Sequence, residues 1–148
     1  MSHIDKQVRD AAATLLTGLT TTGARVYKSR AYPLQDADLP GLRIYVDSSD
    51  ITVDTIGGAN RIQQRNIVLT IEFVGKAIAS YDDNADASKL EIETALANAN
   101  TISSTVKYAQ LRRIETERDA TGEQVVIITT LTYECLAYTA MNAPGTPL

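Results

Sequence analysis

Four stretches of the chain show the alternation of apolar and polar residues that is typical of half-buried strands. The first covers residues 42–47, and a longer one covers 61–74. The core face of this longer strand is predicted to consist of Ile67, Leu69, Ile71 and Phe73. The last two stretches, 108–117 and 124–138, are separated by the turn-forming sequence Asp119-Ala120-Thr121-Gly122, which predicts a β-hairpin. Residues 125–128 are apolar on both faces, which favours a central strand covered on both sides at its start.

Two stretches instead repeat their apolar residues at helical spacing. The first stripe is formed by Ile4, Val8, Ala11, Ala12, Leu15 and Leu19. Ser2 is the expected N-cap of this helix, and a Thr-rich turn between Gly18 and Gly23 is expected to end it. The second helix is predicted over about 84–99, with one apolar face formed by Ile92, Ala95, Leu96 and Ala99.

Leu90 lies nearly opposite the apolar face of the second helix, together with small residues. This second, weaker apolar face indicates a subunit contact, although an Ala-rich helix with one exposed leucine explains the pattern equally well. Arg112 and Arg113 lie in the first strand of the hairpin. They are interpreted either as surface ion pairs or as further subunit contacts.

Residues 48–62 are mostly polar but contain isolated β-branched residues. Two readings compete: a long hairpin loop, or strands that extend beyond the body of the domain. Loops of this length are usually functional or disordered, and we expect a mobile arm that orders against a partner. The residues assigned to this assembly or lumen loop are Asp47, Asp50, Ile51, Val53, Asp54, Ile56 and Arg61.

The order of elements is helix, strand, strand, long loop, strand, helix, strand, strand. It predicts an α+β fold in which two helices pack on a mostly antiparallel sheet of about five strands. We expect a single domain over residues 1–139 and a flexible C-terminal tail over 140–148.

Composition narrows the class of protein. The chain has 148 residues, 44% of them hydrophobic, and no apolar run that could span a membrane, so a soluble protein is expected. The start of the chain lacks a signal-peptide pattern, which favours assembly in the cytoplasm. A formal net charge of −4 argues against general nucleic-acid binding. The single cysteine, Cys135, lies within an apolar strand and is interpreted as a buried structural thiol.

The sequence contains no clear set of catalytic residues. The chain has one histidine, so no nucleophile–histidine pair is evident, and no zinc-ligand pattern is present. Asp82 and Asp83 lack the glycine and glutamate of a calcium loop and are expected to favour the start of a helix. Gly57-Gly58 is not followed by the lysine of a phosphate loop. We therefore expect no enzymatic activity, no cofactor and no metal.

A short β-favouring run at Arg25-Val26-Tyr27 is the first of the five predicted strands, and the connector from it to the strand at 42–47 carries a family resemblance. The resemblance rests on Gly23-Ala24, an aromatic residue at Tyr27, Arg30, and Ala37-Asp38-Leu39-Pro40 leading into the apolar strand that ends at Ile44-Tyr45-Val46. This order resembles the tail terminator proteins of long-tailed bacteriophages, the family of the lambda minor tail protein U. The helix before the connector and the elements after it extend the resemblance loosely over residues 1–138.

The resemblance implies a structural virion protein. Such a protein forms a hexameric ring on the tail tube, stops tube polymerisation and offers a surface for head attachment. The implied partners are further copies of the chain, the tail tube protein and a head completion or connector protein, with DNA passing through the lumen without specific binding. The alternatives are a head–tail joining or neck protein, and a small α+β ligand-binding or enzymatic domain.

Overall fold

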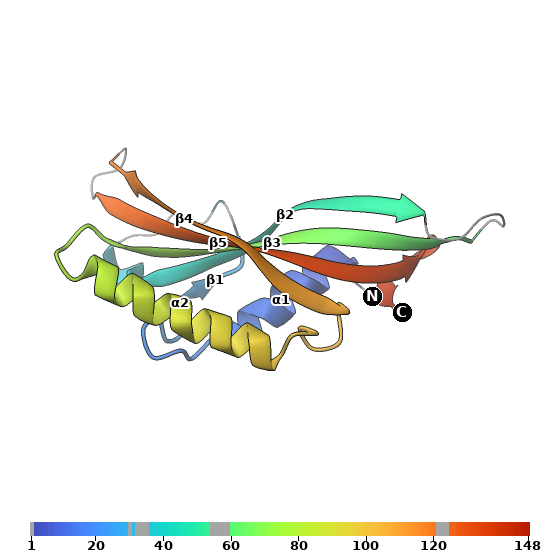
Figure 1. Cartoon of the computed structure of the whole chain (residues 1–148), viewed down its shortest axis with the longest axis horizontal. Coiled ribbons are helices and arrows are strands. Elements are labelled where there is room, and N and C mark those ends of the chain that lie inside the picture. Colours follow the sequence, from blue (N-terminus) through green and yellow to red (C-terminus); the bar gives the residue numbers. More distant parts are fainter. Residues whose placement is uncertain (1, 30, 32–35, 54–59, 121–124) are drawn as a thin grey trace.

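Two helices lie on one face of a six-stranded sheet (Figure 1). The structure is a computed structural model that describes residues 2–29, 31, 36–53, 60–120 and 125–148. Its elements, in chain order, are α1 (Ile4–Leu16), β1 (Val26–Tyr27), a 3₁₀ turn (Asp36–Asp38), β2 (Gly41–Val53), β3 (Ile62–Lys76), α2 (Tyr81–Asn98), β4 (Tyr108–Asp119), β5 (Val126–Ala140) and β6 (Ala143–Pro147).

The sheet runs in the order β1-β2-β3-β5-β4, and β6 pairs with the end of β5. All of these pairings are antiparallel except β1 with β2, which is parallel and covers only two residue pairs. The predicted α+β class and the order of helices and strands are thus confirmed. The sheet has one strand more than expected because the C-terminal residues add β6.

The core lies between the sheet and the two helices. The predicted core face of β3 is confirmed, since Ile67, Leu69, Ile71 and Phe73 are all fully buried. Burying side chains of this size contributes about 1.5–3 kcal/mol each before conformational entropy is counted. The helices supply the opposite side of the core through Ile4, Val8, Ala12, Ala13 and Leu16 of α1 and through Tyr81, Ala85, Ile92 and Leu96 of α2.

The ends of α1 agree only partly with the sequence. The helix stops at Leu16, and Gly18 follows in the left-handed region at φ 91°, as expected for a helix that ends at glycine. The N-cap is His3 rather than Ser2, because the His3 ring nitrogen Nδ1 accepts a hydrogen bond from the Asp5 backbone N–H at 3.1 Å. The His3 imidazole therefore caps the helix in place of the expected Ser2 hydroxyl.

A second, smaller apolar cluster lies on the helix-free face of the sheet. It consists of Leu39, Val74 and Ile128, with Val126 packed against it. Ile127, the neighbour of Ile128, packs instead against the main core. The prediction that β5 is covered on both faces near its start is therefore confirmed.

The expected loop over 48–62 is wrong for its first part. Residues up to Val53 continue β2 and pair in register with β3, from Ser48 opposite Val68 to Val53 opposite Gln63. A ladder satisfies the backbone groups whatever the side chains are, so a polar stretch can still be a strand. Of the two readings, extended strands apply to residues 48–53. Residues 54–59 lie outside the described part of the chain.

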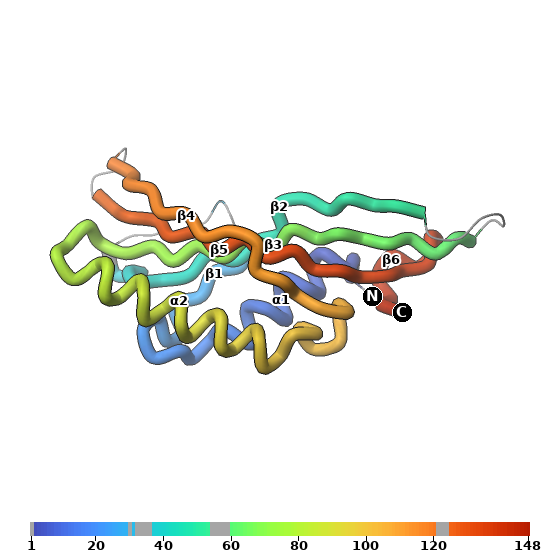
Figure 2. Tube along the Cα trace, in the orientation of Figure 1, coloured from blue at the N-terminus to red at the C-terminus, as the bar shows by residue number. Residues whose placement is uncertain are grey.

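The expected flexible tail is also wrong. Residues Ala143–Pro147 form β6, and the Leu148 backbone N–H donates to the Tyr138 carbonyl at 2.9 Å. The Gln7 side chain of α1 donates to the Gly145 carbonyl. The two prolines sit on a short edge strand, where a missing N–H donor costs little. Figure 2 accordingly shows the two ends of the chain side by side.

Candidate assembly surfaces

The C-terminal part of β2, Ser48–Val53, and the N-terminal part of β3, Ile62–Val68, lie side by side and are together called the arm (Figure 1). A register shift between Val46 and Ser48 marks its base, and Asp47 is the extra residue there. Such a bulge bends the strand and increases its twist. The bulge therefore bends β2 at a defined point, which the polar sequence did not reveal, while β3 stays paired with β5 along the arm.

Ile51 and Val53 lie on the helix side of the arm but remain 50% and 44% exposed. Their cross-strand partners are Arg65 and Gln63. Exposed β-branched side chains on the edge of a sheet are available for contact with another chain. Within the described residues, β1 pairs only with the start of β2, at Leu42 and Arg43, so the β2 edge beyond it is open.

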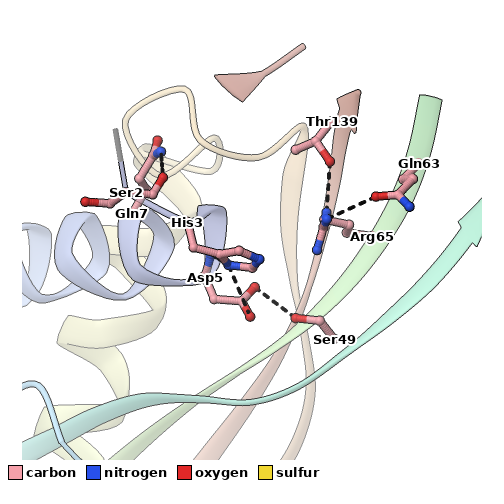
Figure 3. A network of polar contacts seen from close by, with 8 residues as sticks. All are labelled: Ser2, His3, Asp5, Gln7, Ser49, Gln63, Arg65 and Thr139. Carbon is pink, nitrogen blue, oxygen red and sulfur yellow. Dashed lines mark hydrogen bonds and ion pairs between the residues drawn. The ribbon is translucent and has the colours of Figure 1, made fainter. Parts of the chain in front are cut away.

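A network of polar contacts holds the base of the arm to α1 and β5 (Figure 3). The Ser49 hydroxyl donates to Asp5 Oδ1 at 2.9 Å. Arg65, only 5% exposed, donates from Nε to Thr139 Oγ1 at 2.9 Å and from Nη2 to Gln63 Oε1 at 3.1 Å. Beyond Ile67, which belongs to the main core, the arm is fixed largely by polar groups and by pairing with β5.

The remaining residues of the expected assembly loop do not lie together on one surface. Asp47 and Asp50 are exposed, and Asp50 lies opposite Asn66, on the face of the arm away from Ile51. Arg61 precedes β3, and its carbonyl accepts a hydrogen bond from the Met141 N–H at 2.8 Å. Asp54 and Ile56 lie outside the described residues. The loop therefore contributes an acidic side and an apolar side to the arm.

Leu90 is the most exposed large apolar side chain among those described, at 68%. It lies on the outward face of α2, whose other face is buried through Ile92 and Leu96. Beside it, a shallow cavity of about 390 Å³ is lined by residues of the α1–β1 turn and of α2, among them Leu19 and Ala95. The exposed Leu90 agrees both with a second apolar face and with an Ala-rich helix that carries one exposed leucine, so the subunit contact stays a prediction.

Arg112 and Arg113 do not join Leu90. They lie on the edge strand β4, and a register shift between Leu111 and Arg113 makes Arg112 the extra residue. Arg112 Nε donates to Glu134 Oε2 at 3.0 Å, and Arg113 Nε lies 2.6 Å from Glu115 Oε1. Arg113 pairs across the strands with Thr132, so it shares the helix-free face of the sheet. These exposed ion pairs agree with the simpler of the two readings, and charged side chains protect an edge strand from pairing.

A basic cavity lies where α1 meets the end of β1. Its volume is about 350 Å³, and it is lined by Lys6, Arg9, Lys28 and their neighbours from α1 and β2. Asp10 is the shared acid: it pairs with Lys6, with Arg9 Nε at 3.6 Å and with Lys28 Nζ at 3.4 Å. The hydrogen bond from Lys6 lowers the pKa of Asp10, partial burial opposes this shift, and the charge of Lys28 supports it. Sequence reasoning missed this cavity because Lys28 is distant from α1 in the sequence.

Two buried titratable groups on β5, Cys135 and Tyr133, are held in their neutral forms. Burial raises the pKa of the Cys135 thiol to about 12, and the adjacent Glu134 carboxylate adds to the shift. Burial likewise raises the pKa of the Tyr133 phenol, with further contributions from Glu93 and Cys135. The interpretation of Cys135 as a buried thiol is confirmed. In the described ranges, no three His, Cys, Asp or Glu side chains gather as they would around a metal ion.

No helix in the described part of the chain is both long enough and apolar enough to cross a lipid bilayer. No protein-family model matches the chain, and the search of curated proteins gives no match. Among solved structures, one similar chain comes from a structure described as "Virion of native gene transfer agent (GTA) particle". It has a TM-score of 0.44 and 15% sequence identity, over 90% of this chain and 91% of that chain.

Proposed function

We propose that this chain is the tail terminator of a long-tailed bacteriophage or a related particle. Six copies form a ring that caps the tail tube, ends tube polymerisation and provides the surface for head attachment. The resemblance in the connector around Ala37–Pro40 motivates the proposal. The α+β fold supports it, because its order of elements is the one that the resemblance implies.

The observation that carries the proposal is the exposure of apolar side chains at well-separated places on one small domain, among them the outer face of α2 and the arm. Leu90 lies on the outer face of α2, whereas Ile51 and Val53 lie on the arm. Two unlike surfaces of this kind suit a contact in which one side of a copy meets the other side of the next. Repeating such a contact closes a ring when the rotation fits.

The acidic balance suits the proposed lumen. Six copies carry a formal charge of about −24, from −4 per chain. Negative charge along a channel repels DNA phosphates, so the genome would pass without sticking. Asp47 and Asp50 are exposed on the arm, and we place this side of the arm on the inner or tube-facing surface of the ring. A map of the ring with the arm at its outer rim would contradict this placement.

The proposed role needs no catalysis, cofactor or metal, and its partners are all proteins of the particle. These partners are further copies of the chain, the tail tube protein and the head completion or connector protein. The work of the chain is then done by surfaces, which agrees with a cysteine whose pKa is raised to about 12. We place the protein in the virion tail, assembled in the host cytoplasm.

The test is tube growth in the presence of the chain. Purified tail tube protein is allowed to polymerise with and without this protein, and tube lengths are measured by electron microscopy. We expect tubes to stop growing and to carry a ring at one end. Tubes of unchanged length without an added ring would overturn the proposal, and binding to heads alone would assign the chain to the neck.

A further inference from the structure

We propose that the basic cavity around Lys6, Arg9 and Lys28 receives the acidic outer face of α2 from a second copy of the chain. This inference rests on the proposed ring and deepens it, because it names the two surfaces that join neighbouring subunits.

The cavity carries a surplus of positive charge. Lys6, Arg9 and Lys28 share the single carboxylate of Asp10. Asp5 also lines the cavity, and its carboxylate accepts a hydrogen bond from Ser49, so three basic side chains face two acidic ones. Arg9 Nε is buried and makes no hydrogen bond within the described residues. Asp10 Oδ1 lies 3.6 Å from this nitrogen, so the pairing is weak, and the Arg9 side chain as a whole is 34% exposed and can attract a further carboxylate.

The outer face of α2 carries the opposite charge. The helix contains Asp82, Asp83, Asp86, Glu91 and Glu93 and only one basic residue, Lys89. The three aspartates and Glu93 are exposed, whereas Glu91 turns toward the α1–β1 turn and accepts a hydrogen bond from the Thr21 N–H at 3.3 Å. Asp83, Asp86 and Leu90 follow one another at spacings of three and four residues. They therefore lie on one side of the helix, with the apolar side chain next to the acids.

The two surfaces lie on different sides of the molecule. The cavity is formed by α1, the end of β1 and β2, at one edge of the sheet. The helix α2 packs below β3 and β4, toward the other edge (Figure 1). One chain cannot bring its own cavity and its own α2 face together. Successive copies can do so in a head-to-tail arrangement, which is the arrangement that a ring requires.

Charge also decides between a second copy and the other anionic occupant, a nucleic acid. The chain is acidic overall, and such a protein repels DNA at long range. An acidic helix with an exposed leucine offers both carboxylates for the cations and an apolar contact. The half-exposed Ile51 and Val53 lie on β2, the strand that also lines the cavity. A second copy of the chain therefore fits better than DNA.

The test reverses one charge on each surface and then mixes the variants. Lys28→Glu changes the cavity, and Asp86→Lys changes α2; both side chains are exposed, so the fold should be retained. Alone, each variant places like charges at every contact, and we expect at least about a tenfold higher concentration for half-assembly. Mixed in equal amounts, the two variants should recover assembly, because each contact in an alternating ring again joins opposite charges.

The readouts are native mass spectrometry for assembly, circular dichroism for folding and the electrophoretic shift of a DNA duplex for DNA binding. Lys107→Glu, beyond the C-terminal end of α2, makes the same charge change as Lys28→Glu and should leave assembly unchanged. Asp86→Asn separates loss of the 2.8 Å ion pair with Lys89 from charge reversal, and its effect should be smaller.

Three outcomes would overturn the inference while the ring stands. They are normal rings from both reversed variants, loss of assembly that the mixture does not recover, and loss of DNA binding by Lys28→Glu with self-association unchanged. A wild-type chain that forms no ring, either alone or on tail tubes, would instead overturn the ring itself, and the interface with it. The failure of the interface can thus be told apart from the failure of the proposed function.

Discussion

Single residues show how the core sets the chemistry of its polar groups. Cys135 and Tyr133 stand on the same face of β5, both buried, and burial raises the pKa of each. A raised pKa keeps the thiol and the phenol neutral at physiological pH. These groups therefore act as packing side chains.

Cys135 should react only when the protein opens. Because its pKa is raised to about 12, the reactive thiolate is scarce below that pH, and the side chain is fully buried. We expect alkylation by iodoacetamide to be very slow in the folded protein and fast in denaturant, as followed by intact mass. Rapid labelling of the folded chain at neutral pH would contradict the burial of this thiol.

Tyr81 anchors the start of α2 to β5. Its hydroxyl lies 2.6 Å from Thr129 Oγ1, and both residues are buried. Tyr81→Phe should lower the free energy of unfolding by about 1 kcal/mol, since a buried hydrogen bond is lost. The matched control is Tyr108→Phe, at an exposed position, with an expected change within about 0.5 kcal/mol. Equal effects in urea denaturation would show that the Tyr81 hydroxyl contributes nothing specific.

The sequence allowed some residues to be placed and not others. The burial of Phe73 and Cys135 and the exposure of Leu90 follow from local periodicity, and the structure agrees. Arg65 was missed although the period of two places it on the core face of β3, because a charged residue is not expected there. Its burial depends on Thr139, which is distant in the sequence.

Among the elements, the helices and the central strands were predictable, while the arm and β6 were not. Periodicity identifies an element that buries one face, as α1 and β3 do. The Ser48–Val53 part of the arm is exposed on nearly every side chain, and its order comes from backbone pairing with β3. The pattern of apolar and polar residues does not show which strand a segment pairs with, so residues 48–53 were predicted to be a loop.

Strand β2 begins at Gly41, where the close approach of two backbone carbonyls leaves no room for a side chain. A Cβ atom added to Gly41 would lie 2.5 Å from the Asp38 carbonyl oxygen and 3.3 Å from that of Arg25. Gly41→Ala must shift the backbone, and we expect a loss of about 1–3 kcal/mol in the free energy of unfolding. Thermal and urea unfolding would measure it, with Ser48→Ala on the same strand as control. Unchanged stability would mean that the 3₁₀ turn moves freely.

The outer face of α2 can be tested by one substitution. Leu90→Glu should weaken assembly and leave the monomer folded, because the side chain is 68% exposed and packs little within its own chain. The expected change in unfolding free energy is within about 0.5 kcal/mol. Ile114→Glu, on the exposed edge strand β4, is the control and should assemble normally. Assembly of the Leu90 variant at wild-type concentrations would remove this residue from the interface.

At the scale of the whole molecule, the two edges of the sheet differ. β4 carries alternating charges and a bulge, which protect it from pairing with another strand. β2 is open beyond its first residues and bears the apolar side of the arm, and the basic cavity lies beside it. This asymmetry, together with the acidic outer face of α2, gives the domain two different surfaces on opposite sides, as head-to-tail assembly requires.

The fold class could be read from the sequence, whereas the surfaces that would join copies could not. The α+β order follows from local patterns in 42–47, 61–74 and the two helices. The basic cavity combines Lys28 with residues of α1, and its complement on α2 became visible only when both were placed in space. The sequence of a single chain carries even less information about contacts between copies.

The most direct test of the proposed ring is native mass spectrometry of the purified chain across a concentration series. A chain of 16.0 kDa that forms the proposed ring should appear at six times that mass as the concentration rises. Raising the salt concentration should weaken the complex, because part of the contact is ionic. A strict dimer at every concentration, or a monomer that also forms no ring on added tail tubes, would contradict the central claim.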